Sequence, residues 1–252
     1  MIHTLPPPFK ETRSADLAAE IAAMNCLEEC RTSLRLAQIP LPVPIERWIE
    51  HPLKMDYGID DMPGADGYNV LGTKVIRISP RILDDKTRYR WVLAHELGHA
   101  RLHDLKSPRL KLDDPRYSQL YANEVERQAN RFAAAFLMPL RSLVHSFFDI
   151  CRARSLDAEH TIVSLLTRTQ HGPELWYRVF LPELAERFGV NRYGVLFRLG
   201  ELRLGDDTPS FFPDTRLCCT SACTWEAETL FVHVVRTYAI MQTIPPCQYK
   251  AH

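Results

Sequence analysis

The chain has 252 residues, 46% of them hydrophobic and 25% charged, which excludes a disordered, collagen-like or coiled-coil protein. Lysine plus arginine equals aspartate plus glutamate at 31 each, so no global charge favours binding to nucleic acid or to an anionic membrane. The length is sufficient for one substantial core, or for a main domain with a small appendage.

The start of the chain, Met1 to Pro8, has neither the charged residues nor the apolar run of a secretory signal. The apolar stretch Phe132 to Phe148 is interrupted by Pro139, Arg141 and His145, and is shorter than the roughly 20 apolar residues of a membrane helix. An odd number of cysteines, seven, is typical of thiols in a reducing compartment. We therefore expect a cytoplasmic protein without a membrane partner.

Alanine, leucine and isoleucine at helical spacing predict a first helix over Ser14 to Leu36, with its N-cap at the first of these residues. Cys26 and Cys30 share one face of this helix. A cysteine pair at this spacing is able to bind metal, but burial as small apolar side chains is favoured. The proline-rich stretch Ile39 to Pro44 breaks the helix, and a short second helix is expected over Ile45 to Ile49.

Shorter apolar stretches then predict three strands that form a small antiparallel sheet. These strands are Met55 to Ile59, Tyr68 to Leu71 and Val75 to Ser79. Helical periodicity resumes over Asp85 to Leu105 and again over Tyr121 to Met138, where Pro139 ends the helix. The predicted fold class is therefore α+β.

The H-E-x-x-H pattern occurs at His95, Glu96 and His99, inside an apolar-flanked helical stretch. On a helix the two histidines lie one turn apart on one face, where their imidazoles are able to share one zinc ion. Glu96 projects beside that ion and is placed to act as a general base. The short pattern also arises by chance, but its helical context favours a metal site.

A catalytic zinc ion takes three protein ligands, so one more ligand has to come from elsewhere in the chain. The nearby candidates are Glu124, Glu126 and His103. Glu126 is favoured, because Ala129 and Ala133 follow it on the same helical face and would allow a close approach to the first helix.

The other two candidates, Glu124 and His103, are not expected to bind the ion directly. Glu124 is expected to face solvent, because Gln128 and Arg131 continue its stripe and are typical of an exposed surface. His103 lies a further turn away from His95, and we expect it either to contact a ligand from behind or to lie on the surface.

Two further roles stay open at this point. Asn130, four residues after Glu126, is expected either to orient a ligating group through its amide or to be an exposed polar residue. A donor to the developing oxyanion is also needed, and Tyr121, His145 and Arg131 are unranked candidates for it.

Three linked motifs closely resemble those of the ImmA/IrrE family of zinc peptidases. They are His95 to His103, Glu126 to Ala133 and Phe136 to Pro139. The resemblance implies a zincin-like domain with Zn2+ as cofactor, the ligands His95, His99 and Glu126, and Glu96 as catalytic base. It extends from the predicted strands to about Leu204.

Members of this family are bacterial or mobile-element proteins that cleave a helix-turn-helix repressor and so release transcription after stress. The resemblance therefore implies that the partner is a protein substrate of this kind. The sequence departs from the family pattern at Gln128, where a second glutamate is frequent, and in the tail from Leu217, which matches no standard module of the family.

A helix-turn-helix is predicted over Leu184 to Val195, with Gly189 in the sharp turn. The charge over Pro173 to Leu204 is nearly balanced, and its second helix offers mainly Arg192 and Arg198 to a DNA groove. DNA is thus a possible partner, but packing or docking of a repressor is favoured.

The tail contains Cys218, Cys219, Cys223 and His233, whose spacing favours free thiols over a second zinc site. The predicted organisation is a zinc peptidase domain with an N-terminal helix at 1–150, a helix-turn-helix-like unit at 151–204 and the cysteine-containing tail at 205–252. The alternative function is that of a non-proteolytic zinc-containing regulator, or a toxin component, that acts by binding.

Overall fold

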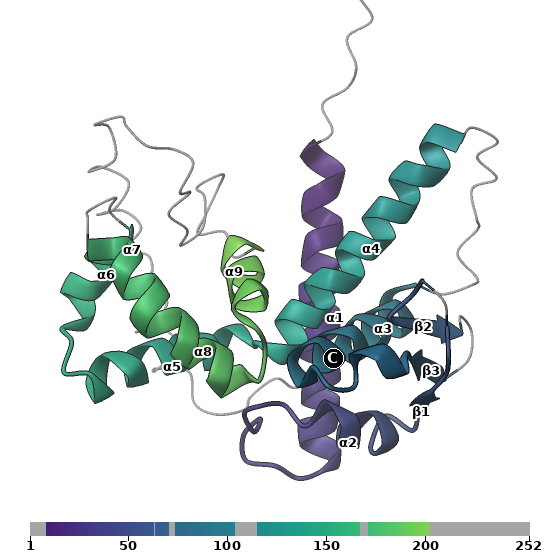
Figure 1. The fold of residues 1–252 in the computed structure, drawn as a ribbon, viewed down its shortest axis with the longest axis horizontal. Helices are drawn as coiled ribbons and strands as arrows, with labels where there is room; N and C mark the ends of the chain where they lie inside the picture. Colours follow the sequence, from purple (N-terminus) through teal and green to yellow (C-terminus); the bar gives the residue numbers. More distant parts are fainter. Residues whose placement is uncertain (1–8, 63, 71–73, 104–114, 167–170, 202–252) are drawn as a thin grey trace, which may run out of the picture. The chain divides into compact units, whose positions relative to one another are not determined.

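The computed structural model describes residues 9–62, 64–70, 74–103, 115–166 and 171–201 (Figure 1). The elements in the first half of the chain are α1 (Phe9–Ser33), α2 (Ile45–Glu50), β1 (Asp56–Ile59), β2 (Gly67–Val70), β3 (Val75–Ile78), the 3-10 helix η1 (Pro80–Ile82) and α3 (Lys86–Leu102). They are followed by α4 (Pro115–Leu137), α5 (Leu140–Ala153), α6 (Ala158–Leu166), α7 (His171–Leu175), the π-helix η2 (Trp176–Phe180), α8 (Leu181–Phe188) and α9 (Arg192–Glu201). The fold is mostly helical with one small sheet, and the predicted α+β class is confirmed.

The chain divides into two compact units. The first comprises the described residues up to Pro139 together with Arg187–Gly194, and the second comprises Leu140–Glu186 together with the described residues from Val195. Among the described helices no single one is long and apolar enough to cross a membrane, although Glu124–Leu137 and Leu140–Ala153 pass that test together as a bent pair.

The sheet of the first unit is mixed, so the predicted antiparallel arrangement is wrong for one strand pair. β2 and β3 form an antiparallel hairpin, but β1 pairs parallel with β3, which is the central strand. Ile59 at the end of β1 and Gly67 at the start of β2 both lie opposite Ile78 of β3. The connection 60–66 is long enough to skip one strand position, and β3 fills the gap between β1 and β2.

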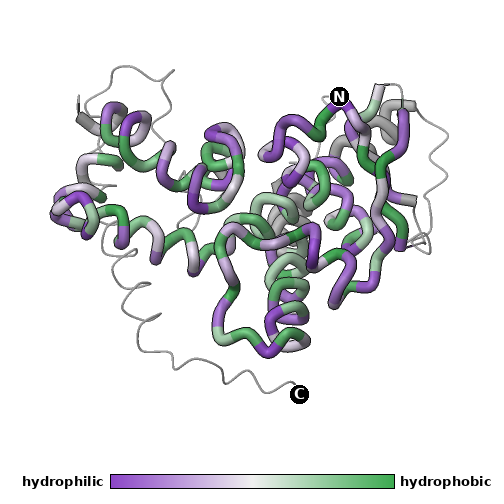
Figure 2. Tube along the Cα trace, turned by 60° about the horizontal axis from the view of Figure 1, so that its bottom comes forward, coloured by the Kyte–Doolittle hydropathy of each residue, from purple (hydrophilic) through white to green (hydrophobic). Residues whose placement is uncertain are grey.

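The core of the first unit lies where α3 packs against the sheet and where α1 and α4 pack against α3. Ile76 and Ile78 of β3 are fully buried, as are many residues of the three helices. The buried helical residues include Ala19, Ala23, Leu27, Leu93, Ala94, Leu97, Ala129, Phe132, Ala133 and Phe136. Hydrophobic positions alternate with hydrophilic ones along the described chain (Figure 2), as expected for amphipathic helices.

The boundaries of the first helix differ from the prediction. α1 begins at Phe9, five residues before the predicted N-cap at Ser14. Lys10 and Glu11 are good helix formers, so the helix starts soon after the prolines and does not need Ser14 as a cap. Cys26 and Cys30 of this helix are buried, as predicted.

The second unit contains α5 and α6, for which the sequence predicted no individual helix, although α6 lies within the helical unit expected at 151–204. Its core is aromatic, since the rings of Phe147 and Phe180 stack with a centroid separation of 4.7 Å and Trp176 packs edge-on against Phe180. Trp176 and Phe180 lie at the two ends of the π-helical turn.

A helix, a turn and a second helix follow one another from α8 to α9, as predicted. Gly189 in the turn has a φ of 63°, in the left-handed region that favours glycine. Asn191 caps α9, because its side-chain oxygen accepts a hydrogen bond from the backbone N–H of Gly194 at 2.8 Å. Arg198 is only 2% exposed and is therefore not available to a DNA groove. The tail with Cys218, Cys219, Cys223 and His233 lies outside the described residues.

Candidate metal centre

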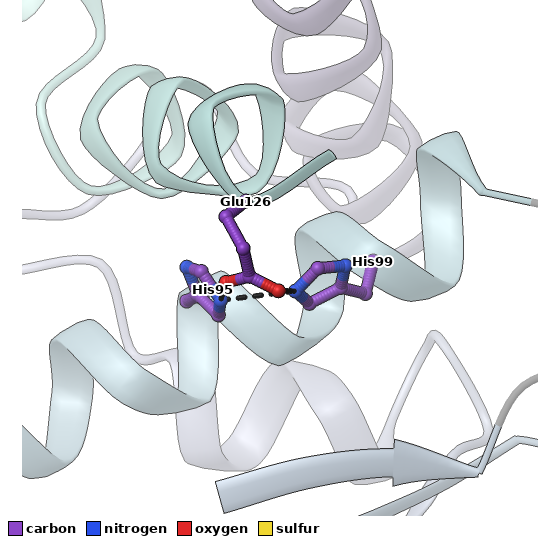
Figure 3. A group of neighbouring side chains, drawn as sticks. All are labelled: His95, His99 and Glu126. Carbon is purple, nitrogen blue, oxygen red and sulfur yellow. Dashed lines mark hydrogen bonds and ion pairs between the residues drawn. The ribbon is translucent and has the colours of Figure 1, made fainter. Parts of the chain in front are cut away.

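The site forms where α3 and α4 approach each other closely. A Cβ atom at Gly98 of α3 would lie 3.1 Å from the backbone oxygen of Ala129 and 3.1 Å from Cβ of Phe132, both on α4. Glycine at this position therefore permits the small separation of the two helices. Figure 3 shows the result: Glu126 extends from α4 toward the rings of His95 and His99 on α3.

Replacing Gly98 with alanine is expected to destabilise the protein by about 0.5 to 2 kcal/mol. The added methyl group overpacks the contact with α4, and the better helix propensity of alanine offsets only part of that cost. Urea unfolding measures the difference. Gly58→Ala serves as control, because a Cβ atom there would lie 3.6 Å from a flexible arginine side chain. Equal effects of the two substitutions would contradict the assigned role of Gly98.

Three ligand atoms converge at this point. Nε2 of His95 and Nε2 of His99 lie 3.0 Å apart. The carboxylate of Glu126 lies 3.1 Å from the first nitrogen and 3.4 Å from the second. Ligand atoms around a tetrahedral zinc ion are separated by roughly 3.3 to 3.5 Å, as follows from bond lengths of about 2.0 to 2.2 Å. The triangle is thus close to one face of such a tetrahedron.

The chemistry of these donors also fits a zinc ion. Among the described residues, His95, His99 and Glu126 form the group of metal-ligating side chains that is compact enough to hold an ion, with its ligand atoms within 4.8 Å of one another. Burial is the main cause that lowers the pKa of His99, to about 4, and the neighbouring His95 contributes to it. His99 is therefore neutral near pH 7, which is the form that binds a metal.

The orientation of the first imidazole is set by Asn130. The side-chain oxygen of Asn130 lies 3.1 Å from Nδ1 of His95 and accepts a hydrogen bond from Nε1 of Trp91 at 3.4 Å. An amide oxygen only accepts, so Nδ1 of His95 carries the proton and Nε2 keeps its lone pair for a metal. The structure therefore places the side chain of Asn130 against the ring of His95.

Two of the ligand candidates lie beside the centre. Nδ1 of His103 is 3.0 Å from Nδ1 of His99, on the side of that ring away from Glu126. Glu124 is partly buried and forms an ion pair with Arg127, which differs from the expected solvent-facing position. Gln128, expected on the same exposed stripe, is also partly buried, because this stripe of α4 meets the end of α3.

Glu96 lies next to the ligands and is only 6% exposed. Burial raises the pKa of its carboxyl group to about 7, and the negative charge of Glu126 adds to this shift. A hydrogen bond from the backbone N–H of Asn69 in β2 opposes the shift. The geometry therefore holds a proton acceptor with a pKa near neutrality beside the three ligand atoms, as general-base chemistry requires.

In the metal-free protein, Glu96→Gln is expected to increase the free energy of unfolding at pH 8 by about 1 to 3 kcal/mol. The pKa of Glu96 is higher in the folded state than the ordinary value of 4.5. Its protonation therefore stabilises the fold at low pH, and this stabilisation is lost as the pH rises through about 7. Glutamine avoids the loss, so urea unfolding after chelator treatment should show a small difference at pH 5 and a larger one at pH 8. A difference independent of pH would contradict this expectation.

The site also contains two residues that the sequence pattern did not single out, Trp91 and Asn69. Trp91 precedes His95 by one helical turn, so their shared face was available as a signal. Asn69 had no such signal, because its contact with Glu96 depends on how β2 packs against α3. Of the oxyanion candidates, Arg131 lies on α4 and His145 on α5, whereas the side chain of Tyr121 lies outside the described part.

Comparisons with known proteins give one structural match and one family match. The chain is similar to the solved structure of a Mycobacterium tuberculosis transcriptional regulator, with 20% sequence identity and a TM-score of 0.46, and the match covers 80% of this chain but 61% of that chain. No protein with a curated description matches the chain. The model of a peptidase family, described as the IrrE N-terminal-like domain, matches residues 54–199. Because this match covers more than half of the 252 residues, the chain belongs to the peptidase family that carries the IrrE N-terminal-like domain, as its motifs predicted.

Proposed function

We propose that this chain is a zinc-dependent metalloendopeptidase in which His95, His99 and Glu126 hold the ion and Glu96 is the catalytic base. The observation that carries the proposal is the convergence of two imidazole nitrogens and one carboxylate, from two helices, beside the buried carboxyl group of Glu96. The family match adds a metallopeptidase-type domain over the same residues.

A zinc ion bound by these ligands supplies Lewis-acid chemistry, because it lowers the pKa of a water molecule and polarises a carbonyl group. Glu96 accepts the proton of the attacking water and passes it to the leaving amine. The pKa of Glu96, raised to about 7 by its burial, suits both transfers, since the group is a competent acceptor and, once protonated, a competent donor. Asn69 holds this carboxyl group in place through its backbone N–H.

We further propose that the substrate is a protein, namely a helix-turn-helix repressor that is cleaved in a stress or mobile-element response in the cytoplasm. The resemblance of the three motifs to ImmA/IrrE peptidases supports this substrate. We assign the peptidase function to residues 1–150 and docking of the repressor to the helix-turn-helix-like unit at 151–204. The burial of Arg198 supports docking over DNA binding.

The test is incubation of the zinc-loaded protein with a helix-turn-helix repressor from its own host, taken first from the genes on either side. Cleavage that stops when a chelator is added is the expected result, and the products identify the cleaved bond by mass spectrometry. A partner that stays intact with zinc-loaded protein, while still binding to it, would favour the alternative of a non-proteolytic regulator or toxin component.

A further inference from the structure

A series of hydrogen bonds leads away from the metal centre on the outer side of His99. Nδ1 of His99 lies 3.0 Å from Nδ1 of His103, and Nε2 of His103 lies 3.2 Å from Oε1 of Gln128. Nε2 of Gln128 donates to Oε1 of Glu124 at 2.9 Å, and Arg127 forms an ion pair with the same carboxylate at 2.6 Å. These five residues, which we call the polar relay, connect the end of α3 to α4.

The direction of the relay is set at its outer end. Glu124 is held as a carboxylate by Arg127, whose guanidinium group donates hydrogen bonds to both of its oxygens at 2.6 to 2.9 Å. A carboxylate only accepts hydrogen bonds, so Gln128 has to turn its NH2 group toward Glu124. The amide oxygen of Gln128 then faces His103.

The orientation of this amide determines which nitrogens of the two histidine rings carry protons. The amide oxygen of Gln128 accepts, so Nε2 of His103 donates to it. A neutral imidazole has one N–H, hence Nδ1 of His103 accepts a hydrogen bond from Nδ1 of His99. The relay therefore favours the tautomer of His99 with its lone pair on Nε2, which is the nitrogen that faces His95 and Glu126. The contact between the two ring nitrogens needs one donor and one acceptor, so the two rings are not both fully protonated.

Two side-chain amides of α4 thus orient the two ligating rings. Asn130 contacts Nδ1 of His95 directly, whereas Gln128 reaches Nδ1 of His99 through His103. The effect is the same for both rings, since each contact favours a proton on Nδ1 and a lone pair on Nε2. Outer partners of this kind orient metal ligands and increase their basicity.

We propose that Gln128 is a positioning residue of the metal centre, which acts through His103 to keep His99 in the tautomer that binds the ion, while Glu124 and Arg127 hold the amide of Gln128. The inference rests on the proposed function in taking His99 as a ligand. It also explains the glutamine at this position: a glutamate would place a second carboxylate 2.9 Å from Glu124. The relay requires one donor between the carboxylate of Glu124 and the ring of His103, and an amide provides both a donor and an acceptor.

The tautomers are tested by nitrogen NMR of the metal-free protein labelled with 15N-histidine, at a pH near 7.5. His99 is expected to carry its proton on Nδ1 and His103 on Nε2. In Gln128→Leu the signals of both rings should move toward a mixture of tautomers, while those of His160, which is exposed on α6, stay unchanged. A wild-type His99 with its proton on Nε2 would overturn the proposal, as would a Gln128→Leu variant with unaltered tautomers.

The effect on metal binding is measured by competition with a zinc chelator. Gln128→Leu is expected to weaken zinc binding about three- to tenfold, less than the roughly 10- to 100-fold loss typical of a direct partner of a ligand. The control Glu29→Gln removes the ion pair of Arg101 near the same end of α3 and should leave the affinity unchanged. Equal affinities of Gln128→Leu and wild type would overturn the inference.

A double variant distinguishes the loss of the relay from a defect in folding. Gln128→Glu together with Glu124→Gln exchanges the carboxylate and the amide, so that each hydrogen bond of the relay again has a donor and an acceptor. This pair is expected to bind zinc more tightly than Gln128→Glu alone, and a failure to do so counts against the relay. None of these measurements uses peptide cleavage, so a protein that binds zinc but cleaves nothing would refute the peptidase and leave the relay standing.

Discussion

Replacing Glu126 with glutamine is expected to weaken zinc binding more than a hundredfold, because a direct ligand contributes more than the roughly 10- to 100-fold of an outer partner. Glutamine has nearly the shape of glutamate but lacks the charge that balances the cation. Glu126 is 58% exposed on its side chain, so the substitution should leave the fold intact. Metal content after dialysis, together with chelator competition, measures the loss.

The control for this variant is Glu159→Gln, which removes an exposed glutamate near the start of α6 and should retain the metal of the wild type. A second readout comes from Glu96. Because the charge of Glu126 helps to raise the pKa of Glu96, that pKa should fall in the variant. Full retention of zinc by Glu126→Gln would show that the third ligand is a different residue and would contradict the proposed geometry of the metal site.

The part of this site that lies on one helix was accessible from sequence alone. His95, Glu96 and His99 follow from the periodicity of α3, which begins where Asp85 caps its first turn with hydrogen bonds to the N–H groups of Thr87 and Arg88. Such contacts are local, so the residue spacing determines them. The placing of Glu126 opposite the histidines required a guess about helix packing, for which Ala129 was the available signal.

The rest of the fold and of the site depends on contacts between segments that are distant in the sequence. The parallel pairing of β1 with β3 could not be read from three consecutive strands, because their order in the sheet depends on where the connection 60–66 leads the chain. Gln128 was read as a surface residue for a similar reason. Its polarity fits an exposed stripe equally well, and only the position of His103, at the end of α3, makes it part of a network.

Glu96→Gln is expected to lower kcat for peptide cleavage by about 10²- to 10⁴-fold, as for removal of a general base, while the zinc ion is retained. Glutamine preserves the size of the side chain and its ability to accept the hydrogen bond from Asn69, but it cannot take a proton near pH 7. The variant should be at least as stable as the wild type in the metal-free state, since it no longer carries a buried carboxylate. A loss of cleavage could then not be attributed to unfolding.

This variant also separates the two kinds of function that a zinc-binding member of the family could have. A peptidase that releases transcription by cleavage loses its effect on the regulated genes when Glu96 is replaced, although the protein remains folded and loaded with zinc. A regulator that acts by contact keeps its effect, because its docking surface is unchanged. The measurement is complementation of a deletion strain by Glu96→Gln, with zinc content determined on the purified variant. Full complementation with full zinc content would assign the ion a structural role and would reject the catalytic role of Glu96.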